Sequence, residues 1–230
     1  MRVGIYGGSF NPVHRGHIQV MKILQEVYHS ISFFLLVSPL NPFKRGASYS
    51  QLAPYEHRLA MARLATDNLP GVYVSDFERH LPLPSYTFNT LSALSRAYPE
   101  HEFQLVIGAD SWQSFPRWYR AQDILDRYEV LVFRRPGYTI DEASLPPTVH
   151  VIDAPQCDIS STQIRQAIAA GSDALNEWLD PKVIDYIRQH RLYQPLPNSR
   201  RSEVEAGGGG ADDLVEGHRL VPQHHAHISE

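Results

Sequence analysis

Six short runs of the sequence are apolar at nearly every position, which is typical of strands buried on both faces of a sheet. They are rich in valine, isoleucine, leucine and phenylalanine, and each is four to eight residues long. The pattern predicts strands at residues 3–6, 31–38, 72–76, 103–109 and 129–135, with 149–153 as a weaker sixth.

Helical patterns lie between these runs and after the last of them. Strands that alternate with helices predict a parallel sheet with helices on both faces, so we expect a doubly wound, Rossmann-like α/β fold of five to six strands. Ligands bind such sheets beyond the carboxyl ends of the strands. The helices are predicted at 17–29, 54–68, 87–97, 121–127, 161–170 and 181–190.

The composition is that of an ordinary globular protein, with 43% hydrophobic and 20% charged residues. No apolar run approaches the ~20 residues needed to cross a bilayer, and the first residues lead into a glycine segment rather than a signal sequence. A single cysteine, Cys157, excludes an intrachain disulfide. These features predict a cytoplasmic protein with no membrane partner.

The net charge of −4 belongs mainly to the end of the chain. From Leu196 onward three arginines face six acidic residues, a balance of −3 that leaves −1 for the remainder. A nearly neutral body argues against a nucleic-acid partner. The end also holds four consecutive glycines and no periodic apolar face, so we expect a domain over 1–194 and a disordered tail over 195–230. Histidines in this tail are only weak evidence for metal binding.

The segment GIYGGSFNPVHRGH, residues 4–17, joins the first predicted strand to the first predicted helix. Glycine costs backbone entropy on folding, so glycines at this turn indicate that a ligand approaches the main chain. A helix N-terminus offers unsatisfied N–H groups and a positive dipole end, which favour an anion. His14 and His17 face the same side, where either ring, partly protonated near neutral pH, would donate hydrogen bonds to a phosphate. Gly16, between the two histidines, has no side chain that would block a ligand from reaching this turn.

Other interpretations remain open for this segment alone. The histidines could merely cap the helix, and a zinc site would lack a complete ligand set. The dinucleotide spacing G-x-G-x-x-G and the P-loop ending G-K-[ST] are both absent. We therefore interpret the segment as a phosphate site of glycines, main chain and two histidines, with no metal held by protein ligands.

The segment ISSTQIR, further along the chain, has the pattern of a second anion-binding helix start. Ser160 and Gln163 form a predicted capping box, which places Ser161 and Thr162 in the first helical turn. Arg165, one helical turn later, adds a planar and permanently charged guanidinium group. Taken alone, a capped surface helix with a solvated arginine would be the simpler interpretation.

Together, GGSFNPVHRGH and ISSTQIR resemble the two signatures of the HxGH nucleotidyltransferases. Three further segments resemble those of the bacterial nicotinate-nucleotide adenylyltransferases: PSYTFNTL (84–91), GADSWQSFPRWY (108–119) and SPLNPFK (38–44). The resemblance runs from about Arg2 to Tyr193. It departs at RHLPLP, where many members have a glycine before SYT, and at Asn11, where many have aspartate.

The resemblance implies transfer of the adenylyl group of ATP to nicotinate mononucleotide, a step of NAD biosynthesis. It implies Mg²⁺ bound through the ATP phosphates, and as catalytic residues His14, His17 and Arg165. For ATP it implies Gly7, Gly8, Ser9, Phe10, Gly16, Gly108, Asp110, Ser160, Ser161 and Thr162. For the mononucleotide it implies Lys44, Ser85, Tyr86, Thr87, Trp118 and Tyr119.

Alternatives remain within and outside this class. Another HxGH transferase would act on nicotinamide mononucleotide, phosphopantetheine or a cytidylyl substrate, and the SYT and WY segments disfavour the last two. A nucleotide-binding module without catalysis is the alternative from a different class. Trp118 could pack in the core instead of stacking on a ring, and Trp112 is expected to pack. A homo-oligomer is one option for the assembly.

Overall fold

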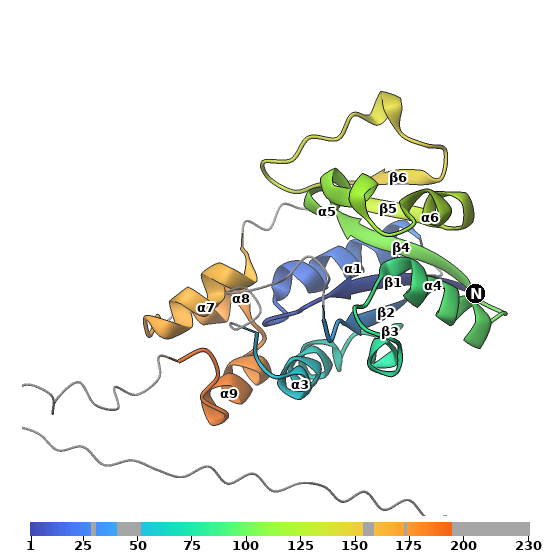
Figure 1. Ribbon diagram of the computed structural model, residues 1–230. Coiled ribbons are helices and arrows are strands. Elements are labelled where there is room, and N and C mark those ends of the chain that lie inside the picture. Colours follow the sequence, from blue (N-terminus) through green and yellow to red (C-terminus); the bar gives the residue numbers. More distant parts are fainter. Residues whose placement is uncertain (29–30, 41–51, 154–158, 173, 195–230) are drawn as a thin grey trace, which may run out of the picture. The chain divides into compact units, whose positions relative to one another are not determined.

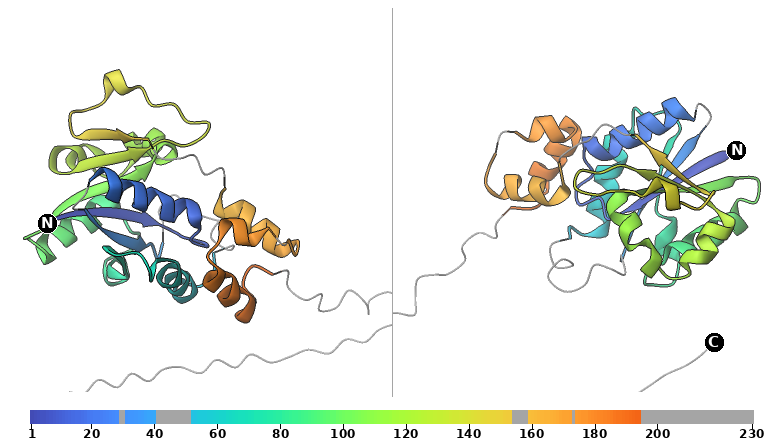
Figure 2. Two further views of the ribbon diagram at one scale, coloured as in Figure 1. Left: turned by 180° about the vertical axis from the view of Figure 1, so that it is seen from behind. Right: turned by 90° about the horizontal axis from the view of Figure 1, so that it is seen from above.

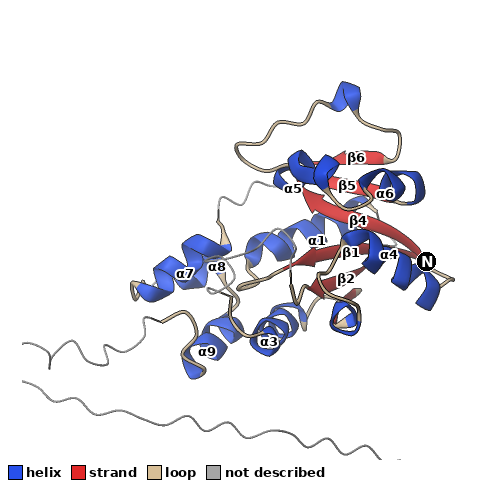
Figure 3. Ribbon diagram, viewed as in Figure 1, coloured by secondary structure: helices blue, strands red, loops and turns tan. Residues whose placement is uncertain are grey.

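Six parallel strands form one sheet in the computed structural model, which describes residues 1–28, 31–40, 52–153, 159–172 and 174–194. The strand order is β3-β2-β1-β4-β5-β6, so the chain moves outward from β1 in one direction and then, from β4, in the other (Figures 1 and 3). The predicted fold class is confirmed. The strands are β1 (Arg2–Gly8), β2 (Ser32–Val37), β3 (Val72–Ser75), β4 (Glu102–Gly108), β5 (Glu129–Phe133) and β6 (Val149–Ile152).

The helices follow the predicted pattern, with two additions. Helices α5 and α8 were not predicted, because their six and four residues are too few to show a period. The described residues also include three short 3₁₀ turns: η1 (Phe77–His80), η2 (Phe115–Arg117) and η3 (Glu142–Ser144). The α-helices are α1 (Arg15–Val27), α3 (Tyr55–Thr66), α4 (Thr87–Ala97), α5 (Ala109–Ser114), α6 (Ala121–Arg127), α7 (Ser161–Ala169), α8 (Leu175–Trp178) and α9 (Pro181–Gln189).

Alternate strand residues supply two hydrophobic cores, one on each face of the sheet. Tyr6 and Val106 belong to the core that α1 and α3 cover, whereas Ile5 and Leu105 belong to the core under α4 and α6. Figure 2 shows α1 and the green helices α4 and α6 on opposite sides of the sheet. Because both faces are buried, the strands are apolar throughout, which is why the sequence pattern located them.

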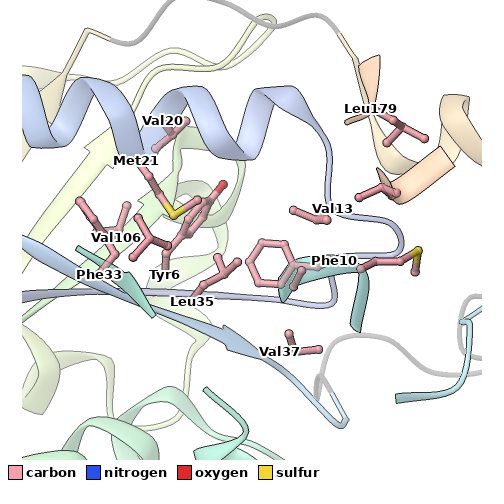
Figure 4. Packing of buried hydrophobic residues seen from close by; sticks show 14 of the residues in the cluster. Tyr6, Phe10, Val13, Val20, Met21, Phe33, Leu35, Val37, Val106 and Leu179 are labelled. Carbon is pink, nitrogen blue, oxygen red and sulfur yellow. The ribbon is translucent and has the colours of Figure 1, made fainter. Parts of the chain in front are cut away.

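The loop between β1 and α1 is anchored in the first of these cores. Phe10 and Val13 are 3% and 0% exposed, and Figure 4 shows them between the strands and Leu179. The Phe10 ring also packs edge-on against Tyr6 at 5.6 Å between centroids. The loop that carries the candidate chemistry is therefore held by apolar side chains on its inner side.

Two expectations fall outside what the structure describes. Lys44 and the tail at 195–230 both belong to segments beyond the described ranges. Within those ranges, no helix has the length and apolar character that a membrane span requires.

Candidate active site

A cavity of about 590 Å³ opens at the carboxyl ends of β1 and β4, where the strand order reverses. This is the position at which doubly wound sheets bind ligands. Gly16 lies buried in the first turn of α1 and is not among the lining residues. The predicted residues that do line the cavity are Gly7, Gly8, Ser9, Phe10, His14, His17, Ser85, Tyr86, Thr87, Gly108, Asp110, Trp118, Tyr119, Ser160, Ser161, Thr162 and Arg165.

Two groups of lining residues are named by their composition. The glycine wall comprises the lining residues between 7 and 17, from the end of β1 into α1, and those between 160 and 165 at the start of α7. The aromatic wall comprises the lining residues between 78 and 90, from η1 into α4, together with residues 118–119. Gly108, Asp110 and Arg135 line the cavity outside both walls. Segments that are far apart in sequence therefore meet around one cavity.

Gly7 and Gly8 are glycines for different reasons. A Cβ on Gly8 would lie 2.9 Å from the Phe10 ring, so packing within the protein excludes a larger residue there. A Cβ on Gly7 would meet no described atom within 4 Å, and Gly7 lines the cavity. The space beside Gly7 is therefore available to a ligand, as expected for a main chain that a phosphate approaches.

The two imidazoles lie side by side at the start of α1. Their ring centroids are 3.7 Å apart, with 36° between the ring planes. His17 Nδ1 accepts a hydrogen bond from the backbone N–H of His14 at 3.1 Å. A neutral His17 ring therefore carries its proton on Nε2, and this N–H is the donor expected beside an anion.

His14 corrects one expectation. The side chain is 5% exposed, and burial together with the nearby Arg135 guanidinium lowers the pKa of His14 to about 3. The ring is neutral near neutral pH, so the expectation that either imidazole is partly protonated there is wrong for His14. Its Nδ1 is buried and has no hydrogen-bond partner among the described residues.

Helix α7 is tied to the loop that follows β1. Ser161 Oγ donates to the carbonyl of Pro12 at 2.9 Å, and Arg165 Nη1 donates to the carbonyl of Asn11 at 3.0 Å. The Tyr193 hydroxyl donates to Asn11 Oδ1 at 2.9 Å. Many family members have aspartate at position 11, and an aspartate oxygen could accept the same hydrogen bond. Asn11 therefore retains the side-chain oxygen acceptor of the family pattern.

The start of α7 has the predicted cap. Ser160 Oγ accepts from the N–H of Gln163 at 3.2 Å, and Gln163 Oε1 accepts from the N–H of Ser160 at 2.8 Å, so the capping box is confirmed. Arg165 Nη2 donates to Thr162 Oγ1 at 3.3 Å. Burial lowers the pKa of Arg165, but a guanidinium stays charged in proteins, so the cation persists at the cavity wall.

Arg58 of α3 joins the loops that follow β1 and β2. It is 2% exposed, and its guanidinium donates to the carbonyls of Ser9 (2.7 Å), Ser38 (2.9 Å) and Ala53 (2.9 Å). The glycine wall is therefore held from behind by a buried cation. Sequence reasoning missed Arg58 because nothing in a helical pattern distinguishes a buried arginine from a solvated one.

Asp110 lies in the first turn of α5, and Arg135 follows β5. Arg135 Nε is 3.4 Å from Asp110 Oδ1, and both side chains line the cavity. Arg135 was not predicted as a site residue because the fifth strand was predicted to run to residue 135, whereas β5 ends at Phe133. The arginine is therefore in the position beyond a strand end where ligands bind.

The aromatic wall presents rings and hydroxyls. Tyr86 and Tyr119 lie 4.8 Å apart between ring centroids, and Tyr119 is 50% exposed. Trp118 lines the cavity and also packs 5.3 Å from Phe115, so it both lines the cavity and contributes to the core. Trp112 stacks on Phe115 at 5.0 Å, which confirms the packing expected for it.

Glu78 of η1 is a further cavity residue that sequence reasoning missed. It is 7% exposed, and its Oε1 accepts a hydrogen bond from Thr90 Oγ1 at 2.8 Å. Burial raises the pKa of Glu78, and the hydroxyls of Thr90, Ser38 and Ser85 offset the rise in part. Glu78 Oε2 and Ser85 Oγ are buried and have no hydrogen-bond partner among the described residues.

The described cavity lining has few carboxylates compared with a metal site formed by protein ligands alone. Across the described ranges, no three histidine, cysteine or carboxylate side chains are grouped to hold a metal ion. In the cavity, Asp110 faces Arg135 and Glu78 is buried with a raised pKa. This donor set fits an ion that arrives bound to phosphate oxygens and water, as Mg²⁺ prefers.

The family comparison defines the class of protein. The profile of the cytidylyltransferase-like family matches residues 5–167, which include both the glycine wall and the aromatic wall. This class consists of nucleotidyltransferases, whose substrates carry phosphate groups.

Curated relatives narrow the class. Proteins from Bacteroides fragilis and Bacteroides thetaiotaomicron, both named "Probable nicotinate-nucleotide adenylyltransferase", are 46% and 43% identical to this chain. The alignments cover 82% and 83% of the chain and 92% of each relative. The chain belongs to the cytidylyltransferase-like family and, within it, to the nicotinate-nucleotide adenylyltransferases.

Solved structures share the fold. A nicotinic acid mononucleotide adenylyltransferase from Plasmodium falciparum, solved in complex with NaAD, matches with a TM-score of 0.70 at 22% identity. The match covers 84% of this chain and 97% of that one. At this identity the likeness supports the arrangement of strands and helices.

Proposed function

We propose that this protein transfers the adenylyl group of ATP to nicotinate mononucleotide and releases pyrophosphate. The observation that carries the proposal is that one cavity joins two walls of complementary chemistry. The glycine wall suits a triphosphate, because it combines an open main chain at Gly7, two imidazoles and Arg165. The aromatic wall suits a flat, charged ring, because it combines Trp118 and Tyr119 with the start of α4.

The chemistry needs no protein nucleophile. An oxygen of the 5′-phosphate of the mononucleotide attacks the α-phosphorus of ATP in line, the bond to the β-phosphate oxygen breaks, and pyrophosphate leaves with the electron pair. Catalysis is then positioning and stabilisation of charge on the phosphoryl oxygens. Mg²⁺, when bound with ATP, would neutralise part of the phosphate charge.

The residues of the glycine wall have separate parts in this scheme. His17 donates from Nε2 to an oxygen of the α- or β-phosphate, and neutral His14 contributes hydrogen-bonding capacity without charge. Ser161, Thr162 and Arg165 hold the β- and γ-phosphates at the start of α7. Because Ser161 and Arg165 also bond to the loop after β1, phosphate binding and loop geometry depend on the same side chains.

The remaining expectations belong to the same proposal. The catalytic domain spans residues 1–194, with 195–230 as an appended tail, and Lys44 steers a substrate phosphate. Asp110 accepts a hydrogen bond from a ribose hydroxyl, and the enzyme acts in the cytoplasm.

Pyrophosphate release tests the proposed function directly. The full chain is supplied with ATP, Mg²⁺ and either nicotinate mononucleotide or nicotinamide mononucleotide in parallel reactions. Faster release with the acid supports the proposal. Faster release with the amide would assign a different acceptor, and release with neither would favour the interpretation as a non-catalytic binding module.

A further inference from the structure

Glu78 is a buried acid at a place where the proposed substrate is itself an anion. It lines the cavity beside Tyr86 and Thr87, the segment to which the proposed function assigns the pyridine ring. If ionised, its carboxylate would repel the carboxylate of nicotinate. If neutral, it would supply an O–H donor to that group.

The contacts of Glu78 favour the neutral form. Oε1 accepts a hydrogen bond from the hydroxyl of Thr90, whereas Oε2 is buried and makes no well-formed hydrogen bond within the described ranges. The hydroxyls of Ser38 and Ser85 lie near the carboxyl group and stabilise its anion only in part, because burial is the larger effect. An ionised oxygen left in this state would carry a large desolvation cost. The direction of the pKa shift, upward through burial, agrees with this argument.

No neighbouring charge of the described chain reverses this preference. The titratable groups around η1 lie on several elements, and none of them contributes to the shift of Glu78, whose causes are burial and three hydroxyls. Arg79, the next residue, is paired with Glu56 of α3 instead. The other neighbours are Asp76 and His80 beside and on η1, Tyr55 on α3, Tyr86 before α4, and Asp110, Arg135 and His17 across the cavity.

We propose that Glu78 is a specificity-determining residue that, as a neutral acid, donates a hydrogen bond from Oε2 to the carboxylate of nicotinate mononucleotide. Ser85 Oγ is also buried, makes no well-formed hydrogen bond in the described structure and lies near Glu78 in the same wall, so it provides a second donor when Glu78 is neutral. The inference rests on the proposed function and adds how the acid is distinguished from the amide.

The proposal makes the choice between the two mononucleotides depend on pH. Below its raised pKa, Glu78 is neutral and favours the nicotinate carboxylate. As the pH rises through that pKa, the ionised carboxylate repels the acid and accepts a hydrogen bond from the amide NH₂ instead. The ratio of kcat/KM for the acid to kcat/KM for the amide therefore falls as the pH rises.

The test measures this ratio from mildly acidic to alkaline pH for the full-length wild type, Glu78→Gln and the control Glu177→Gln, which changes an exposed glutamate of α8 outside the cavity lining. Groups that act equally on both substrates, such as His17 and the ATP phosphates, cancel in the ratio. We expect a fall of about tenfold or more in the wild type and in Glu177→Gln, because a hydrogen bond to a charged group is lost. In Glu78→Gln, which has a neutral donor at every pH, the ratio stays flat.

Thr90→Val supplies a second readout should Glu78→Gln fold poorly. It preserves side-chain volume and removes the hydroxyl that stabilises the anion, so the fall in the ratio moves to higher pH. A purely structural Glu78 would change both kcat/KM values equally. If the wild type turns over nicotinate mononucleotide but the ratio does not change with pH, the inference about Glu78 is wrong and the proposed function stands. If neither mononucleotide is turned over, the proposed function is wrong as well.

Discussion

The two walls of the cavity use their polar groups differently. At the glycine wall, Ser161 and Arg165 of the wall and Arg58 behind it donate to carbonyls of the loop after β1, so side chains hold the backbone in place. In the aromatic wall, Glu78 Oε2 and Ser85 Oγ are buried without a partner in the described chain. The backbone of the first wall is held in place before a ligand arrives, although His14 Nδ1 there is also buried without a partner among the described residues. The second wall leaves hydrogen bonds for the ligand to complete.

Removal of the His17 donor should produce the largest effect on the glycine wall. We expect His17→Ala to lower kcat by about two to three orders of magnitude with the fold intact, because one donor aimed at developing charge contributes about 2.7–4 kcal/mol. Steady-state kinetics with ATP and nicotinate mononucleotide measure kcat, and His150→Ala, which changes a partly exposed histidine of β6 outside the cavity lining, is the matched control. Turnover within about threefold of the wild type would remove His17 from the mechanism.

Loss of Arg58 should break the support of the same wall. Arg58→Met leaves three buried carbonyls without their charged donor, so we expect the free energy of unfolding in urea to fall by ~3 kcal/mol. Arg63→Met, on the exposed side of α3, should change it by less than ~0.5 kcal/mol.

Removal of a hydroxyl from the aromatic wall should change the free energy of unfolding by almost nothing. Ser85→Ala removes a hydroxyl that has no partner in the described protein, so the stability should stay within ~0.5 kcal/mol of the wild type. A large destabilisation by Ser85→Ala, or none by Arg58→Met, would contradict the difference between the walls.

Burial of His14 should make the glycine wall sensitive to acid. The folded-state pKa is lowered to about 3, so the stability this ring contributes is fully present above the ordinary value of 6.5 and is lost as the pH falls toward 3. At about pH 5 the loss amounts to ~2 kcal/mol. Unfolding of His14→Gln at neutral and acidic pH should show a correspondingly smaller decline, while His150→Gln keeps the decline of the wild type.

A modest effect on substrate binding is expected at the edge of the aromatic wall. Tyr119 is half exposed, so Tyr119→Ala should leave stability unchanged and raise KM for the mononucleotide about two- to tenfold, the equivalent of ~0.5–1.5 kcal/mol of ring stacking. Tyr98→Ala, which removes an exposed tyrosine outside the cavity lining, is the control. An unchanged KM in Tyr119→Ala would show that this ring does not contact the substrate.

Much of the fold and of the glycine wall could be predicted because the signals are local. Continuous apolar runs locate strands buried on both faces, and the spacing of Ser160 and Gln163 predicts a cap that the structure confirms. Helix α5 was missed because its six residues, read as a turn after the fourth strand, are too few to show a period.

The residues that were missed depend on distant neighbours. Glu78, Arg58 and Arg135 are ordinary charged residues in the sequence, and none follows a recognisable spacing. Glu78 and Arg58 become important because other elements bury them, and Arg135 because β5 ends two residues earlier than predicted. The aromatic wall was therefore only half predicted, through its SYT and WY segments.

The sequence by itself determined the order of strands and helices, the starts of the two helices proposed to bind anions and the family to which the chain is similar, because each depends on residues close together along the chain. Only the tertiary structure decided that His14 is neutral, that α7 holds the loop after β1, and that Glu78 lies in the cavity as a buried acid. Those properties depend on desolvation and on hydrogen bonds between residues far apart in the chain, which no local pattern records.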